Sequence, residues 1–245
     1  MKYLTLFMFL ASIGVQAETA KEAWMSLIPE NQQNREAYAF VENKPDLPNV
    51  FIYGDSISIT YTPTVRSELD GEANVYRLHV NGGDSSSVIG KVDTLVRTMG
   101  DHWDFKWDVI HFNVGLHDLK YVLDGKLNKG KGEQVSTMDE YEANLRDVIR
   151  YFMRIAPGAK LIFATTTPVP QGETGRHAID AGRYNRVALR VLETYPEIIV
   201  NDLYSFTKPH HAEWWTKPGN VHYNETGKAA QGKEVARVIR EALKE

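Results

Sequence analysis

The chain reads VFIYGDS over Val50–Ser56, where an apolar run meets a Gly-Asp-Ser tripeptide. A short, continuous apolar run of this kind is typical of a strand that is buried on both faces of a parallel sheet. In α/β sheets, ligands bind at the carboxyl ends of the strands. A tight turn at Gly54 would therefore present the hydroxyl of Ser56 where a nucleophile is needed. Short Gly/Asp/Ser clusters are also ordinary turn chemistry, so the tripeptide alone does not decide the function.

Four more apolar runs along the chain predict strands of the same buried kind. They span Asn74–Val80, Val109–Asn113, Leu161–Thr165 and Ile198–Asp202. Segments with helical periodicity alternate with them, at 88–96, 137–152, 180–192 and 235–242. Regular alternation of strands and helices predicts an α/β fold, a three-layer α/β/α sandwich around a central five-stranded parallel sheet.

Three later segments share the character of the first one. They read NGGDS at 81–85, GLHD at 115–118 and GNVH at 219–222. Each follows a predicted strand or precedes the last predicted helix, so all of them could converge at the carboxyl edge of the sheet. This ordered set, with serine first and histidine last, resembles the SGNH/GDSL hydrolase superfamily over roughly Val50 to Leu243. The resemblance implies a flavodoxin-like sandwich and a serine ester hydrolase, and it implies no cofactor.

Ser56 and His222 are the candidate catalytic pair. A serine hydroxyl is a poor nucleophile at its free pKa and needs a positioned base to remove its proton. We expect His222 to be that base, because it lies in a loop before the last helix and the matching histidine has this role in the SGNH family. The alternatives are an exposed turn serine and a histidine that only leads into the helix.

Gly83 and His117 are the candidate donors to the oxyanion of the tetrahedral intermediate. Gly83 matches the family glycine whose backbone N–H serves this purpose, and glycine lets the backbone approach a ligand closely. The third block of the family usually reads Gly-x-Asn-Asp, and His117 stands here in place of the asparagine. An imidazole N–H can also donate, and Asp118 could hold the tautomer of the ring. A plain turn at Gly83 and a structural histidine at 117 are the alternatives.

The fourth block departs from the family pattern, which is Asp-x-x-His. Gly219 occupies the aspartate position, so another acceptor must orient the imidazole of His222. Asn220 is the first choice, because its amide oxygen can accept from the ring as in papain-like triads. A backbone carbonyl or Glu213 are the alternatives. The missing aspartate also leaves open a relative that kept the fold and lost turnover.

Five residues are candidates for substrate binding: Asp55, Asp118, Thr166, Trp214 and Trp215. Thr166 and its neighbour Thr167 follow a predicted strand, and we expect them to line the cleft beside Asn113. Trp214 and Trp215 precede His222 and could form a sugar-stacking or acyl-pocket wall, although tryptophan is usually a packing residue.

Other polar residues carry weaker signals. Arg176 and Arg183 flank the cleft and could bind an anion, but solvated surface arginine is the more ordinary interpretation. His210 and His211 with Glu213 could suggest a metal site. Adjacent histidines point in different directions and no third ligand has a matching spacing, so we expect no metal.

Composition limits the remaining function classes. The 245 residues carry a net charge of −4 with mixed signs and no basic stripe, which argues against a nucleic-acid partner. Since the chain has no cysteine, disulfides, thiol catalysis and Cys-based zinc sites are excluded. Residues 1–17 are typical of a cleaved secretory signal peptide, with an apolar stretch too short to span a membrane. We expect a lead-in over 18–47, with a helix near 20–28, and the hydrolase domain over 48–245.

These features predict a secreted or periplasmic serine esterase that removes O-acetyl groups from carbohydrates. Its expected partner is a small-molecule or polysaccharide ester, and neither nucleic acid nor a stable membrane span is expected. Hydroxyls, amides and aromatic faces suit a sugar better than a long acyl chain, which requires a continuous apolar channel. Two alternatives stay open, a catalytically degenerate glycan-binding protein and a lipase or lysophospholipase.

Overall fold

Five parallel strands form the central sheet of the protein, in the order β2-β1-β3-β7-β8. The structure is a computed structural model that describes residues 18–244, so the predicted signal peptide lies outside the described residues. The strands are β1 (Asn49–Tyr53), β2 (Asn74–Arg77), β3 (Val109–Phe112), β7 (Lys160–Ala164) and β8 (Ile199–Asn201). All four neighbouring pairs are parallel, which confirms the predicted sheet.

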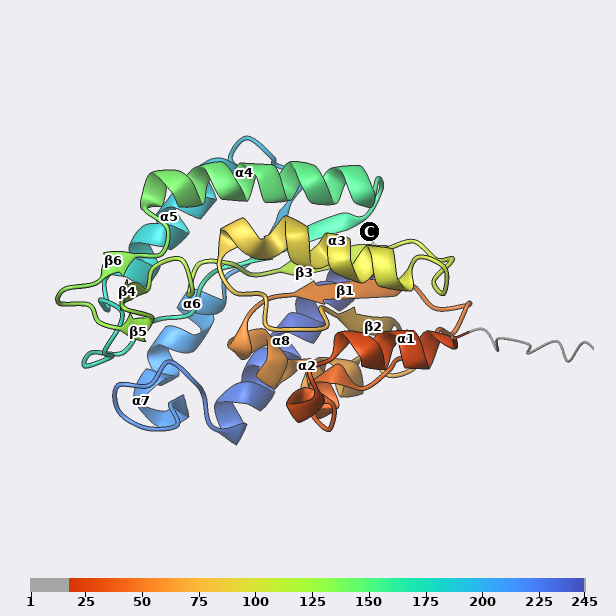
Figure 1. Ribbon diagram of the computed structural model, residues 1–245, viewed down its shortest axis with the longest axis horizontal. Coiled ribbons are helices and arrows are strands. Elements are labelled where there is room, and N and C mark those ends of the chain that lie inside the picture. The colour runs from red at the N-terminus through yellow and green to blue at the C-terminus, as the bar shows by residue number, and fades with distance from the viewer. Residues whose placement is uncertain (1–17, 245) are drawn as a thin grey trace, which may run out of the picture.

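Helices cover both faces of this sheet (Figure 1). One face carries α2 (Ser56–Glu68) and α8 (Glu225–Lys244). The other carries α3 (Val88–Met99), α4 (Met138–Ile155) and α5 (Asp180–Leu192). The predicted three-layer α/β/α sandwich is therefore confirmed. Among the described helices, none combines the length and the hydrophobicity that a membrane span requires.

The register of the sheet brings the sequence blocks to one edge. Val50 of β1 pairs with Val75 of β2 on one side and with Val109 of β3 on the other. Because these strands run in the same direction, their carboxyl ends meet at one edge of the sheet. The segments that leave this edge carry Ser56 after β1, Gly83 after β2 and His117 after β3.

Close packing of α2 against α8 positions the fourth sequence block, GNVH at 219–222, which lies just before α8. Gly232 of α8 lies so near Thr64 of α2 that a β-carbon at Gly232 would come within 2.5 Å of the Thr64 β-carbon. Further along both helices, Arg240 of α8 donates to the backbone oxygen of Glu68 at the end of α2. The two helices therefore run in the same direction, and their amino termini lie at the same end. Ser56 begins α2 and His222 lies just before α8, and this parallel packing brings them together.

The lead-in segment packs onto the sandwich. It contains α1 (Ala20–Leu27), which matches the predicted helix, and the 3-10 turns η1 (Glu30–Gln32) and η2 (Glu36–Tyr38). Trp24 is buried, and its indole N–H donates to the backbone oxygen of Tyr38 at 2.8 Å. The lead-in is therefore part of the folded core.

Some elements differ from the sequence-based expectation. β2 ends at Arg77 and not at Val80. A small antiparallel sheet of β4 (Tyr121–Leu123), β5 (Lys126–Leu127) and β6 (Glu133–Gln134) follows β3, and its strands are too short and exposed to show a pattern. Four short elements also lack a sequence signal: η3 (Ser85–Ser87), α6 (Leu203–Thr207), η4 (Lys208–His210) and α7 (His211–Trp214).

Candidate active site

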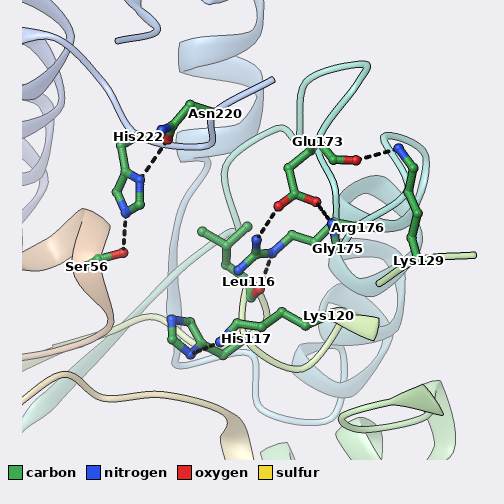
Figure 2. Close-up of polar contacts among 10 residues, drawn as sticks. All are labelled: Ser56, Leu116, His117, Lys120, Lys129, Glu173, Gly175, Arg176, Asn220 and His222. Carbon is green, nitrogen blue, oxygen red and sulfur yellow. Dashed lines mark hydrogen bonds and ion pairs between the residues drawn. The ribbon is translucent and has the colours of Figure 1, made fainter. Parts of the chain in front are cut away.

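Three side chains form a hydrogen-bonded chain at the carboxyl edge of the sheet (Figure 2). Ser56 Oγ lies 2.9 Å from His222 Nε2, and His222 Nδ1 lies 2.8 Å from Asn220 Oδ1. Ser56 and Asn220 thus each bond one nitrogen of the His222 ring, which is the order of contacts that a nucleophile, a base and an orienting acceptor require.

The backbone identifies the proton positions in this chain. The N–H of His222 donates to Asn220 Oδ1 at 2.8 Å, so the amide oxygen and not the amide nitrogen of Asn220 faces His222. Since that oxygen can only accept, Nδ1 of the ring must carry the proton that it shares with Asn220. Nε2 is then unprotonated and accepts the hydroxyl proton of Ser56. This is the tautomer that a general base needs.

The environment of His222 keeps the imidazole neutral. Partial burial lowers the pKa of His222 below its ordinary value, and Arg176 and Lys228 lower it further. The charge of Asp55 opposes them and raises the pKa of His222. A lowered pKa means that the base stays unprotonated at neutral pH.

Asp55 fixes the start of α2. Its carboxylate accepts from the N–H of Ile57 at 2.9 Å and caps the helix. The residue is 2% exposed, so it acts on the site through its charge and its cap, and its predicted substrate contact is not supported by its position. Capping leaves the N–H of Ser56 in the first turn, where backbone donors have no partner within the helix.

The loop that carries Gly83 is held by its preceding carbonyl. The oxygen of Gly82 accepts from Tyr53 Oη at 2.7 Å, Lys91 Nζ at 2.7 Å and Ser87 Oγ at 3.0 Å. In a trans peptide, the next N–H points away from that carbonyl. The N–H of Gly83 accordingly points the other way and donates to Asn81 Oδ1 at 3.0 Å. An oxyanion would have to displace this side-chain oxygen to use the donor.

His117 is bonded to a lysine and not to the expected aspartate. Its Nδ1 lies 2.6 Å from Lys120 Nζ. Asp118 is fully buried and accepts from the backbone N–H and the hydroxyl of Ser85. The prediction that Asp118 holds the His117 tautomer, or contacts substrate, is therefore wrong. Its carboxylate joins the second and third blocks, because Ser85 begins the turn after Gly83.

The sequence comparison identifies the family of this arrangement. The sequence model of GDSL-like lipases and acylhydrolases matches residues 31–235. The chain belongs to the GDSL-like lipase/acylhydrolase family. It is a serine hydrolase of carboxylic esters, and the resemblance drawn from its four blocks is confirmed. A search of curated proteins found no significant match to this hydrolase.

Solved structures with the same fold include several esterases. A lipase/acylhydrolase from Enterococcus faecalis superposes with a TM-score of 0.61 at 17% identity, covering 79% of this hydrolase and 96% of that chain. An acetyl xylan esterase gives 0.60 at 15% identity, covering 78% and 99%. An acetylxylan esterase from Geobacillus stearothermophilus gives 0.59 at 17% identity, covering 78% and 94%. At these identities the likeness concerns the fold.

The lead-in segment of the hydrolase forms one wall of a pocket that contains Ser56. The pocket has a volume of about 510 Å³. Its lining includes Ser56, together with Asn31, Gln32, Arg35 and Tyr38 of the lead-in and Asn81 and Lys91 of the core. Sequence reasoning missed this wall, because the polar lead-in carries no motif.

Several predicted lining residues of the hydrolase lie elsewhere. Asn113, Thr166 and Thr167 are 8%, 1% and 3% exposed. Thr166 donates to the oxygen of Val114 at 3.2 Å and lies against Gly115, whose φ of +138° and close contact leave no room for a side chain. Thr166 therefore supports the loop before His117. Since all three side chains are buried, their predicted role as cleft surface is corrected.

The two tryptophans pack α7 against its neighbours. Trp214 is 8% exposed, with its ring stacked on His210 and close to Phe206, so its predicted role as a substrate wall is corrected. Trp215 is half-buried beside His211, and the substrate role predicted for it stays a prediction. In residues 18–244, no group of three or more acidic, histidine or cysteine side chains is arranged to hold a metal.

Arg176 is a buried support and not a surface arginine. It forms an ion pair with Glu173 at 2.9 Å, in which the two side chains are 6% and 5% exposed. Its Nε donates to the backbone oxygen of Leu116 at 2.8 Å (Figure 2). The pair therefore anchors the residue directly before His117. Arg183, by contrast, is about half exposed and pairs with Asp180 at 3.3 Å.

Proposed function

We propose that this hydrolase removes O-acetyl groups from carbohydrates, with Ser56 as nucleophile and His222 as general base. The observation that carries the proposal is the continuous contact from Ser56 through His222 to Asn220. In this arrangement the ring proton is held on Nδ1 and Nε2 is free to accept the serine proton.

The reaction then proceeds in two steps. Ser56 Oγ attacks the ester carbonyl while His222 Nε2 takes its proton, and the departing alcohol leaves with that proton. A water molecule, activated by the same imidazole, then attacks the acetyl-enzyme and releases acetate. The negative oxygen of each tetrahedral intermediate receives hydrogen bonds from the N–H of Ser56 and the ring of His117. The N–H of Gly83 joins them once the oxyanion has displaced Asn81 Oδ1 from it.

The pocket lining supports a sugar as the alcohol part of the ester. Amide and guanidinium groups of Asn31, Gln32, Arg35 and Asn81 line the pocket that contains Ser56, beside the apolar residues Pro29, Ile59 and Val80. Such groups hydrogen-bond to sugar hydroxyls, whereas a long acyl chain requires a continuous apolar channel. Two of the structural relatives are described as acetylxylan esterases, which agrees with this substrate class.

A location outside the cytoplasm belongs to the same proposal. The sequence of residues 1–17 has the basic start, apolar stretch and small residues of a secretory signal peptide. Export would bring the enzyme to extracellular or periplasmic polysaccharides. N-terminal sequencing of the protein from the culture medium or periplasm tests this part, and a start at Glu18 is the expected result.

A substrate panel tests the chemical proposal. We expect the rate on p-nitrophenyl esters to fall from acetate to butyrate to octanoate, and acetate to be released from acetylated xylo-oligosaccharides. Faster cleavage of octanoate, with no acetate released from any acetylated glycan, would favour a lipid substrate. Glycan binding without release of acetate or p-nitrophenol would indicate a binding protein.

A further inference from the structure

The contact between Lys120 and His117 determines which ring nitrogen carries a proton. The two nitrogens involved, Lys120 Nζ and His117 Nδ1, are 2.6 Å apart. Burial lowers the pKa of Lys120, whereas the charges of Asp55, Asp84 and Asp118 favour its ammonium form. In that form the group has three donors and no acceptor, so Nδ1 accepts and carries no proton. A neutral imidazole has one N–H, which then lies on Nε2. Among the described residues, Nε2 of His117 has no hydrogen-bond partner.

We propose that Lys120 is a positioning residue that makes His117 an oxyanion donor. By donating to Nδ1, Lys120 holds the neutral ring in the form whose Nε2–H is free for the tetrahedral intermediate. This inference rests on the proposed function, because a donor is useful only where an oxyanion develops. The asparagine of the family pattern needs no such partner, because an amide has a fixed N–H donor. The histidine at position 117 does need one, and Lys120 fills that role.

The surroundings of the pair hold it rigidly. The backbone oxygen of Leu116, one residue before His117, accepts from Arg176 at 2.8 Å. The N–H of Tyr121, one residue after Lys120, donates to the oxygen of Gly175 at 2.7 Å. In Figure 2, Lys120 reaches the His117 ring from the side opposite to Ser56. Both ends of this turn are thus fixed to the 173–176 loop, and the ring has little freedom to rotate.

The charges around His117 oppose its protonation. Burial is the largest cause that lowers the pKa of His117, and the cations of Lys120, Arg176 and Lys91 lower it further. Asp55 acts in the opposite direction, and the pKa of His117 is lowered to about 4. The neutral ring therefore persists through the pH range in which His222 works as a base. Asp55 and Arg176 shift the pKa of both His117 and His222, so the two rings lie within electrostatic range of the same charged side chains.

The ring nitrogens can be observed directly by NMR. Long-range ¹H–¹⁵N correlation of the ¹⁵N-labelled full chain distinguishes a protonated ring nitrogen from an unprotonated one, and His117→Asn assigns the signals. For wild type we expect an unprotonated Nδ1 and a protonated Nε2, unchanged between about pH 5.5 and 8 since the pKa lies near 4. In Lys120→Met, Nδ1 loses its donor and a repelling charge. In this variant the His117 ring should populate both tautomers, and its pKa should be higher than in wild type.

Kinetics gives the functional half of the test. We expect Lys120→Met to lower kcat on p-nitrophenyl acetate roughly 10-fold with little change in KM, and its kcat should acquire an extra pH dependence near the raised pKa of His117. Lys120→Arg keeps a cationic donor and should retain most of the wild-type kcat. Lys233→Met, an exposed lysine on α8, is the matched control and should behave as wild type.

Two results would overturn the inference. One is a wild-type spectrum in which Nδ1 of His117 carries the proton at pH 7, and it requires no variant to fold. The other is a folded Lys120→Met with an unchanged ring spectrum and unchanged kcat. Failure of the proposed function is a separate outcome, since wild type would then be no faster than Ser56→Ala while the ring spectrum still reports the tautomer.

Discussion

Asn220 Oδ1 accepts two hydrogen bonds from the single residue His222, one from its backbone N–H and one from Nδ1, each 2.8 Å long. The backbone bond fixes which end of the amide faces the ring, so a neutral amide can orient the base without ambiguity. An aspartate would orient the ring equally well, but its charge would also stabilise the imidazolium form. In the proposed mechanism, Asn220 orients the base as a triad acid does, but it adds no negative charge beside the ring.

Two substitutions of Asn220 separate the orientation of the ring from the electrostatic stabilisation of its charged form. Asn220→Ala removes the orienting acceptor and should lower kcat about 10- to 100-fold, a smaller loss than that of Ser56→Ala. Asn220→Asp adds a charge that favours protonated His222, which raises the pKa of His222. Activity requires the neutral base, so the acid limb of the kcat/KM profile should move to higher pH. An Asn220→Asp profile that overlays wild type would show that residue 220 does not act on the ring.

Removal of His117 tests the oxyanion assignment. His117→Ala should lower kcat by roughly 10²- to 10³-fold with little change in KM, as expected for the loss of a donor that acts only in the transition state. His117→Asn supplies the amide donor that the family pattern has at this position and should recover part of the loss. Near wild-type turnover of His117→Ala would make the residue structural.

The contact between α2 and α8 should be sensitive to a single methyl group. In Gly232→Ala the new β-carbon would come within 2.5 Å of the Thr64 β-carbon and 3.0 Å of the Tyr61 backbone oxygen. We expect a loss of about 1–3 kcal/mol in the free energy of unfolding and a lower kcat, because the helices also hold Ser56 and His222. Gly90→Ala is the control: Gly90 lies in α3 with no atom within 4 Å of the new carbon. It should gain about 0.4–1 kcal/mol. Urea denaturation measures both, and equal effects would contradict the packing argument.

The buried ion pair should dominate the stability of the loop before His117. Arg176→Leu leaves Glu173 without its cation in a site where the side chain is 5% exposed, which should cost about 3–5 kcal/mol. Arg183→Leu breaks a half-exposed pair and should cost less than about 1 kcal/mol. Leucine at both 173 and 176 should be more stable than Arg176→Leu. If the two arginine variants are equally stable, Arg176 does not support the loop.

The strands and the family were predictable from the sequence because their signals are local. A continuous apolar run such as Val50–Tyr53 specifies a buried strand, and the order of the four blocks specifies the family. Helix α2 left no such signal. It follows Ser56 as ISITYTPTV, rich in β-branched residues and with Pro63 inside, and it forms because Asp55 caps it and α8 covers it.

Long-range contacts explain why some predictions about side chains were wrong. Asp118 is next to His117 in sequence, but its carboxylate accepts a hydrogen bond from the backbone N–H of Ser85. The ring of His117 is instead bonded to Lys120, one turn later. Asn220 was predicted as the orienting residue because it is near His222 in sequence and its amide oxygen can accept from the ring. The structure has this hydrogen bond and adds a second one, from the backbone N–H of His222. The wall formed by Arg35 and Tyr38 depends on how the lead-in docks, which no local pattern encodes.

The most direct test of the account is the value of kcat/KM for p-nitrophenyl acetate in wild type and in Ser56→Ala. Ser56 is half-buried and its hydroxyl contacts only His222 among the described residues, so the alanine variant should keep the wild-type fold and melting temperature. If Ser56 is the nucleophile, its removal should lower kcat/KM by about 10³-fold or more. A folded Ser56→Ala protein that retains wild-type kcat/KM would contradict the account.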